Sequence, residues 1–223
     1  MSVSQIGLIL LVACIVAMLS RRLKLPYSVG LVAAGIGLAF LGEPIHSGQT
    51  VVVQGTGSLS LFVLQLAHRI GAEAIATTTS ADKAARAKAL GAAHVINRAE
   101  RPDWGAAVLE ITDGRGADQI VEVAGGDNLN HSVQAVAPGG RIWLAGVLEG
   151  FEARFASVPA IHTFATIQAV FVGHRKGLEN LVRAIDVNRL DPVIDTEFEF
   201  SAFHGALARL KQGPFGKVVV RLD

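Results

Sequence analysis

From His46 onward, short apolar runs alternate with segments of helical pattern, and this alternation restricts the chain to few folds. The runs are apolar on both faces, which is typical of strands in parallel sheets that helices cover on both sides. The order β-α-β-α-β followed by α-β-α-β matches the doubly wound nucleotide-binding plan. We therefore predict an α/β fold with a doubly wound parallel sheet of the Rossmann type, preceded by an apolar helical leader.

The expected elements follow from where the two patterns change. The expected strands are Thr50–Gln54, Ala74–Thr78, His94–Ile96, Gln119–Val123, Arg141–Ala145 and Ile167–Val172. The expected helices are Ser60–Ile70, Ala81–Leu90, Trp104–Thr112, Leu129–Val136 and Gly177–Asn188. From Pro192 the tail is expected to form a strand, a helix capped by Ser201, a Gly-Pro turn and a strand, as a supporting element and not another βαβ unit. The chain thus divides into a leader (1–45), a dinucleotide-binding domain (46–175) and a C-terminal element (176–223).

The first expected strand ends in the turn Gly55-Thr56-Gly57, which opens a helical pattern. This turn satisfies two of the three glycine positions of G-x-G-x-x-G, and the small Ser60 stands at the third. Gly55 would make the tight turn, and Gly57, which lacks a Cβ, would let a pyrophosphate approach the amides of the helix start. The alternative is a turn with a purely structural role, but the position after the first strand favours phosphate binding.

The end of the second expected strand carries hydroxyl side chains, Thr77 to Ser80, where an NAD site usually has an acid. Ser80 is also a suitable cap for the following helix. Lys83 lies one turn into that helix, and Arg98 ends the third strand region. Hydroxyls and two cations suit an additional 2′-phosphate, so the sequence favours NADP(H) over NAD(H). The alternative is that both cations are ordinary solvated surface charges.

Composition excludes several classes of function. A net charge of +1 implies no general attraction to nucleic acid. The single cysteine, Cys14, rules out an intramolecular disulfide, and the seven histidines show no paired ligand spacing, so we expect no zinc site. The lone cysteine fits a reducing compartment, and the cytoplasm is the expected location. No catalytic residue can be assigned from the sequence.

The leader contains two apolar runs, Ile6–Leu19 and Tyr27–Leu41. Each has about fifteen residues, fewer than the ~20 that cross a hydrocarbon core. Two interpretations stay open: membrane contact through residues 6–41, or docking of Tyr27–Leu41 on the sheet. Docking is feasible because each buried large aliphatic side chain contributes ~1.5–3 kcal/mol.

Five segments, in family order, resemble the C-terminal part of the medium-chain dehydrogenase/reductase family, in its quinone-reductase or zinc-type alcohol dehydrogenase-like branch. They read GQTVVVQGTGSLSLFVLQLA, ADKAARAKALGAAHVIN, QIVEVAGG, VAPGGRIWLAGVL and GKVVVRL. The resemblance runs from about His46 to Asp223 and implies a dinucleotide cofactor and the strand order 3-2-1-4-5-6. The residues expected to contact the cofactor are Gly55, Thr56, Gly57, Ser58, Leu59, Thr78, Thr79, Ser80, Lys83, Arg98, Ala124, Gly125, Gly146, Val147 and Gly173.

The family's N-terminal catalytic domain has no counterpart in this sequence. Hydride transfer to a carbonyl or quinone, the activity that the resemblance implies, also needs a positioned acceptor and often a proton donor. We therefore expect cofactor binding with little or no turnover unless a partner supplies the missing half. Whether the chain forms a homo-oligomer stays open.

The leader has a resemblance of its own. The stretch RRLKLPYSVGLVAAGIGLAFLG is similar to the start of a cation:proton antiporter membrane domain, but it is too short for a transport pathway. Two alternative functions therefore accompany the first: a membrane-tethered nucleotide-sensing module linked to an antiporter, and an inactive fusion fragment.

Overall fold

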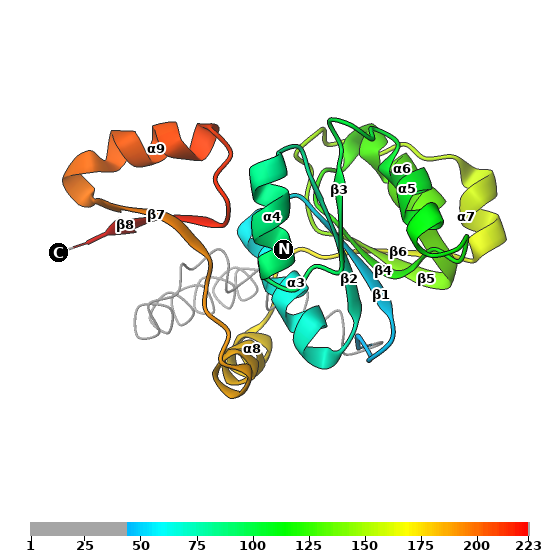
Figure 1. Ribbon diagram of the computed structural model, residues 1–223, viewed down its shortest axis with the longest axis horizontal. Helices are drawn as coiled ribbons and strands as arrows, with labels where there is room; N and C mark the ends of the chain where they lie inside the picture. The colour runs from blue at the N-terminus through cyan, green and yellow to red at the C-terminus, as the bar shows by residue number, and fades with distance from the viewer. Residues whose placement is uncertain (1–43, 223) are drawn as a thin grey trace, which may run out of the picture.

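The computed structural model describes residues 44–222, and its centre is one six-stranded parallel sheet (Figure 1). The strands are β1 (Thr50–Gln54), β2 (Glu73–Thr78), β3 (His94–Asn97), β4 (Ala117–Glu122), β5 (Val136–Leu144) and β6 (Thr166–Ala169). Their order is β3-β2-β1-β4-β5-β6, and every neighbouring pair is parallel. The predicted α/β class and the strand order 3-2-1-4-5-6 are confirmed.

Helices cover both faces of this sheet because successive strand residues point to opposite sides. The covering helices are α3 (Ser58–Ile70), α4 (Ala81–Ala89), α5 (Trp104–Ile111), α6 (Leu129–Ala135) and α7 (Ser157–Thr163), with a short 3-10 helix η1 (Gly126–Asn128) before α6. Val51 and Val53 of β1 belong to the apolar cluster that contains residues of α3 and α4. Val52, between them, belongs to the cluster that contains Trp104 of α5 and Leu129 of α6. The strands are therefore apolar on both faces, as the sequence predicts.

Three departures from the predicted elements lie late in the main sheet. Strand β5 begins at Val136 and not at Arg141, so residues expected at the end of a helix and in a loop belong to the strand. Helix α7 was not expected from the sequence, and none of its residues is buried. Strand β6 ends at Ala169 and not at Val172, and Phe171 beyond it is 88% exposed. Val170 still donates its N–H to the carbonyl oxygen of Leu144, but Phe171 and Val172 lie beyond the sheet, so hydrophobicity alone overestimates the strand.

The chain then leaves the sheet through α8 (Arg175–Asn188) and forms a second, smaller sheet. This sheet pairs β7 (Ile194–Glu199) with β8 (Lys217–Arg221), joined by the 3-10 helix η2 (Phe200–Ala202) and α9 (Phe203–Lys211). Because β7 and β8 are parallel and α9 packs on both, this element is a βαβ unit, and the expectation that it is not one is wrong. Ser201 lies inside η2 and does not cap α9, whose cap position is Ala202.

The second sheet touches the main sheet through the loop between α9 and β8, and Figure 1 shows both units side by side. Phe215 of this loop is 2% exposed and belongs to the apolar cluster of α3 and α4, with the guanidinium of Arg86 4.1 Å from its ring centre. The next residue, Gly216, donates its N–H to the carbonyl oxygen of Thr56 at 2.9 Å. The C-terminal loop is thereby joined to the glycine turn after β1.

Both interpretations of the leader concern residues 1–43, which lie outside the described part of the chain. Within residues 44–222, no helix combines the length and the apolar character that a membrane crossing needs.

Candidate functional site

A cleft of about 500 Å³ opens at the carboxyl ends of β1 and β2, where ligands bind in open parallel sheets. Its walls come from the glycine turn and start of α3, the end of β2, the loops after β3, β4 and β5, and the C-terminal loop. The lining residues are Gln54, Gly55, Thr56, Gly57, Ser58, Leu59, Ser60, Thr78, Thr79, Lys83, Arg98, Val123, Ala124, Leu148, Glu149, Leu210, Gly213, Pro214 and Gly216.

The glycine turn leaves the start of α3 open to the cleft. Gly55 has φ 69°, a left-handed conformation that favours glycine, and its N–H donates to Thr77 Oγ1 at 3.2 Å. At Gly57, the cap residue of α3, no atom lies within 4 Å of where a Cβ would stand. No side chain caps this helix and its first turn carries no acid, so its amides and the positive end of its dipole are available to an anion.

Ser60, at the third fingerprint position, joins the start of α3 to the end of β1. Its hydroxyl donates to the carbonyl oxygen of Gln54 at 2.7 Å, and the side chain is buried. A larger residue at this point would separate the helix from the strand. The serine therefore serves the close helix–strand packing that a small third residue provides.

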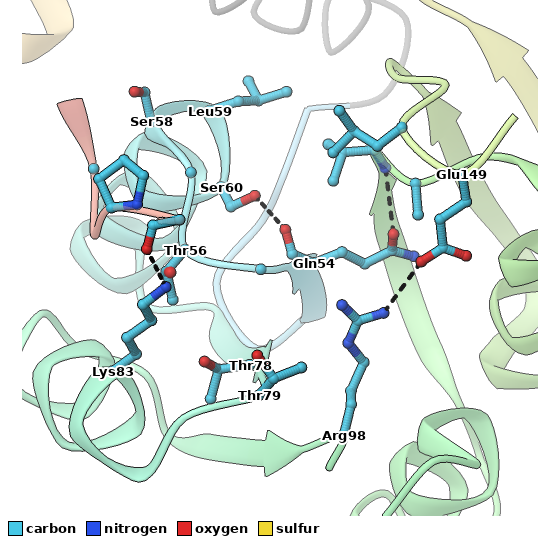
Figure 2. Close-up of a pocket in the computed structure, with 18 of the residues that line it drawn as sticks. Gln54, Thr56, Ser58, Leu59, Ser60, Thr78, Thr79, Lys83, Arg98 and Glu149 are labelled. Carbon is cyan, nitrogen blue, oxygen red and sulfur yellow. Dashed lines mark hydrogen bonds and ion pairs between the residues drawn. The ribbon is translucent and has the colours of Figure 1, made fainter. Parts of the chain in front are cut away.

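Two cations flank the hydroxyl side chains at the end of β2. In Figure 2, Lys83 and Arg98 lie on either side of Thr78 and Thr79. The backbone N–H of Arg98 donates to the carbonyl oxygen of Thr78 at 2.7 Å, which holds Arg98 beside the strand end. Ser80 caps α4 as predicted, since its hydroxyl accepts from the N–H of Lys83 at 3.4 Å.

Both cations already have contacts with other parts of the cleft wall. Lys83 Nζ donates to the carbonyl oxygen of Gly213 at 2.5 Å, which links α4 to the C-terminal loop. Arg98 Nη1 lies 3.8 Å from Glu149 Oε1, beyond hydrogen-bonding distance, and Arg98 Nε is buried without a hydrogen-bond partner. Arg98 therefore keeps unused donors at the cleft.

A buried polar network supports the floor of the cleft. The carboxylate of Glu122, at the end of β4, is fully buried and accepts hydrogen bonds from Gln54 Nε2 at 2.8 Å and Ser132 Oγ at 2.6 Å. It also accepts the backbone N–H groups of Ala124 and Gly125, each at 2.9 Å. These bonds fix the end of β1 to the loop after β4, two walls of the same cleft.

Asp195 fixes the C-terminal loop. Its carboxylate accepts two hydrogen bonds from Arg209, at 2.7 and 2.8 Å, and one from the backbone N–H of Phe215 at 2.9 Å. The hydrogen bonds from Arg209, followed by the N–H of Phe215, hold the pKa of Asp195 well below its usual range even though burial opposes this. The loop that carries Gly213 is thus held in position by a charge pair at its base.

The structure brings most of the sequence-predicted site residues together. Those that line the cleft are Gly55, Thr56, Gly57, Ser58, Leu59, Thr78, Thr79, Lys83, Arg98 and Ala124. Ser80, Gly125, Gly146, Val147 and Gly173 do not line it. The sequence prediction lacked Gln54, Glu149 and the C-terminal loop, because their proximity arises from contacts between distant parts of the chain.

The part of the chain that the structure describes offers no metal centre: no three His, Cys, Asp or Glu side chains in residues 44–222 are grouped to hold an ion. These residues therefore supply no ligand set for zinc.

The sequence model of the family "Zinc-binding dehydrogenase" matches residues 58–186. A zinc-type alcohol dehydrogenase-like protein of Schizosaccharomyces pombe is 33% identical over 184 residues, which are 80% of this chain and 53% of that protein. A crystal structure assigned as an alcohol dehydrogenase from Sinorhizobium meliloti 1021 has a TM-score of 0.80 and 48% identity, and covers 87% of this chain and 56% of its own. A crystallised NAD-dependent alcohol dehydrogenase gives a TM-score of 0.77 at 30% identity, over 86% of this chain and 56% of its own.

The chain therefore spans about half the length of these relatives. The antiporter-like stretch, residues 21–42, lies outside the family match and outside the described residues. The matched region contains β2 to β6, the helices between them and most of the cleft. The chain belongs to the zinc-binding dehydrogenases of the medium-chain dehydrogenase/reductase family, of which it comprises the nucleotide-binding domain.

Proposed function

We propose that this chain binds NADP(H) in preference to NAD(H), as the cofactor-binding half of an alcohol dehydrogenase-like or quinone reductase-like oxidoreductase. The observation that carries the proposal is the pair of cations, Lys83 and Arg98, beside the hydroxyls of Thr78 and Thr79. An NAD site usually has an acid at this strand end, which would repel a 2′-phosphate. Hydroxyl groups and cations bind such a phosphate through charge-assisted hydrogen bonds.

In this proposal the glycine turn, Gly55 to Gly57, and the open start of α3 hold the pyrophosphate. Ser58 and Leu59, at the start of α3, and Ala124, in the loop after β4, also line the cleft. The bound cofactor would supply the hydride. The chain's own residues would orient the cofactor and exclude water from its phosphates.

Hydride transfer to a carbonyl or quinone belongs to the proposal only with a substrate-binding unit. The relatives are about twice as long as the matched region, and residues 44–222 contain no group of side chains that could hold a metal ion. We therefore expect this chain to bind cofactor with little or no turnover by itself. Relatives include an NAD-dependent alcohol dehydrogenase, so the cofactor choice depends on the residues of this cleft and not on membership of the family.

The test is a fluorescence titration of the full chain with NADPH and with NADH. Lys83→Glu is expected to weaken NADPH binding by ~10–100-fold, the equivalent of one lost charge-assisted hydrogen bond, and NADH binding by less than ~3-fold. Lys88→Glu, on an exposed position of the same helix, is the matched control and should leave both affinities unchanged. Equal losses for the two cofactors in Lys83→Glu would refute the preference for NADP(H), and no binding of either cofactor would refute the function.

A further inference from the structure

Glu149 stands in the cleft wall facing a cation that the proposed cofactor would need. Among the described residues that line the cleft, it carries the only carboxylate. Its Oε1 lies 3.8 Å from Arg98 Nη1, and Figure 2 shows the two side chains pointing toward each other from the loop after β5 and the end of β3. The side chain of Glu149 is half exposed and that of Arg98 is 28% exposed. Neither is fixed by deep burial.

The backbone around Glu149 is held independently of its side chain. Its N–H donates to the carbonyl oxygen of Ala124 at 2.7 Å, and its carbonyl group lies against Gly126. The loop is also joined to the β4 loop by a bridge between Gly125 and Gly150. A change of the carboxylate to a neutral amide of the same size therefore alters the charge in the cleft and leaves the loop in place.

Arg98 is the member of the pair with unused binding capacity. A guanidinium has five N–H donors, and in Arg98, which lines the cleft, the buried Nε has no hydrogen-bond partner. The Glu149 contact is long for a hydrogen bond and satisfies its charge only in part. A phosphate at Thr78 and Thr79 would compete with Glu149 for the same guanidinium, because both are anions that Arg98 can bind.

We propose that Glu149 is a specificity-determining residue: by engaging Arg98 it lowers the affinity of the cleft for the 2′-phosphate of NADP(H) and narrows the preference over NAD(H). This inference rests on the proposed function. Glu149 acts on the phosphate through Arg98 and has no such effect on NAD(H), which carries a hydroxyl at the same position. The cleft thus combines two cations that favour the phosphate with one carboxylate that opposes it.

The test compares NADPH and NADH affinities of the full chain in Glu149→Gln. NADPH binding is expected to tighten by about three- to fivefold, as expected when a partly exposed charge pair is released, while NADH affinity changes by less than about twofold. Glu152→Gln is the matched control, because Glu152 lies in the same loop and has a similar 3.8 Å ion pair, with Arg154, but does not line the cleft. This control should leave the ratio of the two affinities unchanged.

A double-mutant cycle then tests the route through Arg98. In an Arg98→Gln background, Glu149→Gln should no longer raise the NADPH affinity. A ratio that Glu149→Gln does not change, or a gain that is the same with and without Arg98, would overturn the inference and leave cofactor binding untouched. A wild-type chain that binds neither cofactor would instead overturn the proposed function together with this inference.

Discussion

The main sheet and the small sheet of β7 and β8 are both parallel, but they differ in what covers them. Every residue of β1 is buried, with helices on both faces of the sheet. In β8 four residues are partly buried and the last is exposed, and among the described elements α9 makes the main helical contact with both strands. Parallel sheets normally have both faces covered. The main sheet is therefore held by apolar burial, and the small sheet has to rely on something else.

The contacts of the small sheet with its surroundings include an aromatic anchor, Phe215, and a charge cluster around Asp195. Phe215 inserts into the core of the main sheet, and Asp195 binds both Arg209 and the N–H of Phe215. Large apolar residues elsewhere in the element stay exposed, such as Phe200 at 61% and Leu210 at 57%. The candidate cofactor cleft therefore has one wall in the well-buried main sheet and another wall in an element that is more exposed.

The largest expected effect comes from Trp143, which is fully buried in β5. Trp143→Ala should lower the free energy of unfolding of the whole domain by ~3–5 kcal/mol, because it removes a large buried side chain and leaves a cavity. Urea unfolding followed by circular dichroism measures this loss. Trp143→Phe keeps most of the apolar volume but loses the hydrogen bond to Gln119 Oε1 at 2.7 Å, and should cost about 1–3 kcal/mol. A cost below about 1 kcal/mol for the alanine variant would contradict the view that burial stabilises this sheet.

The second effect should be local. Phe215→Ala should lower by ~2–4 kcal/mol the free energy that holds the β7–α9–β8 element on the main sheet. The loss should therefore appear as local opening of this element and not as unfolding of the whole domain. Hydrogen exchange should accelerate at amides of β7 and β8 and stay slow in β1 and β4. NADPH affinity should fall as well, since Gly216 next to it contacts the glycine turn. Phe200→Ala, an exposed aromatic of the same element, should change stability by less than about 0.5 kcal/mol.

If the exchange in β1 rose together with that in β8, the two units would unfold as one and the distinction between them would fail. The same result would mean that the loop between α9 and β8 unfolds together with the core of the main sheet.

The sequence predicted the main sheet well because its signals are local. β1 has the expected bounds, because its run of residues buried on both faces begins after the polar Gln49 and ends at the glycine turn. The βαβ geometry of the tail was missed because the direction of β8 depends on its pairing with β7, which no local pattern encodes. Helix α7 was missed because it is only seven residues long and none of its residues is fully buried, so its amphipathic pattern is weak.

Some residues of the candidate site could likewise be predicted from local patterns, and others could not. Residues next to the glycine turn and the end of β2 were predicted because the fingerprint and the strand end mark them in the sequence. Glu149 and Gly213 were not, because Glu149 meets Arg98 and Gly213 meets Lys83 across long stretches of chain. These long-range contacts become visible only when the loops are placed.

The smallest expected effect concerns the charge cluster and depends on pH. The pKa of Asp195 is lowered in the folded protein, mainly by Arg209, from an ordinary value of about 3.9. Its carboxylate therefore stabilises the element fully above that ordinary value, and this contribution is lost as the pH falls through the lowered pKa. Asp195→Asn should destabilise the element by about 1–3 kcal/mol at pH 7, from the loss of hydrogen bonds to a charged group. The difference in the stability of this element between the wild type and Asp195→Asn should shrink as the pH falls below about 4.

Hydrogen exchange at α9 and β8 in both proteins, at neutral and acidic pH, measures this difference. Asp191→Asn, at an exposed position before β7, should behave like the wild type throughout. A difference that stays constant from neutral to acidic pH would mean that the carboxylate acts by shape and not by charge. The small sheet would then be held by packing like the main one, and the contrast between them would be one of degree.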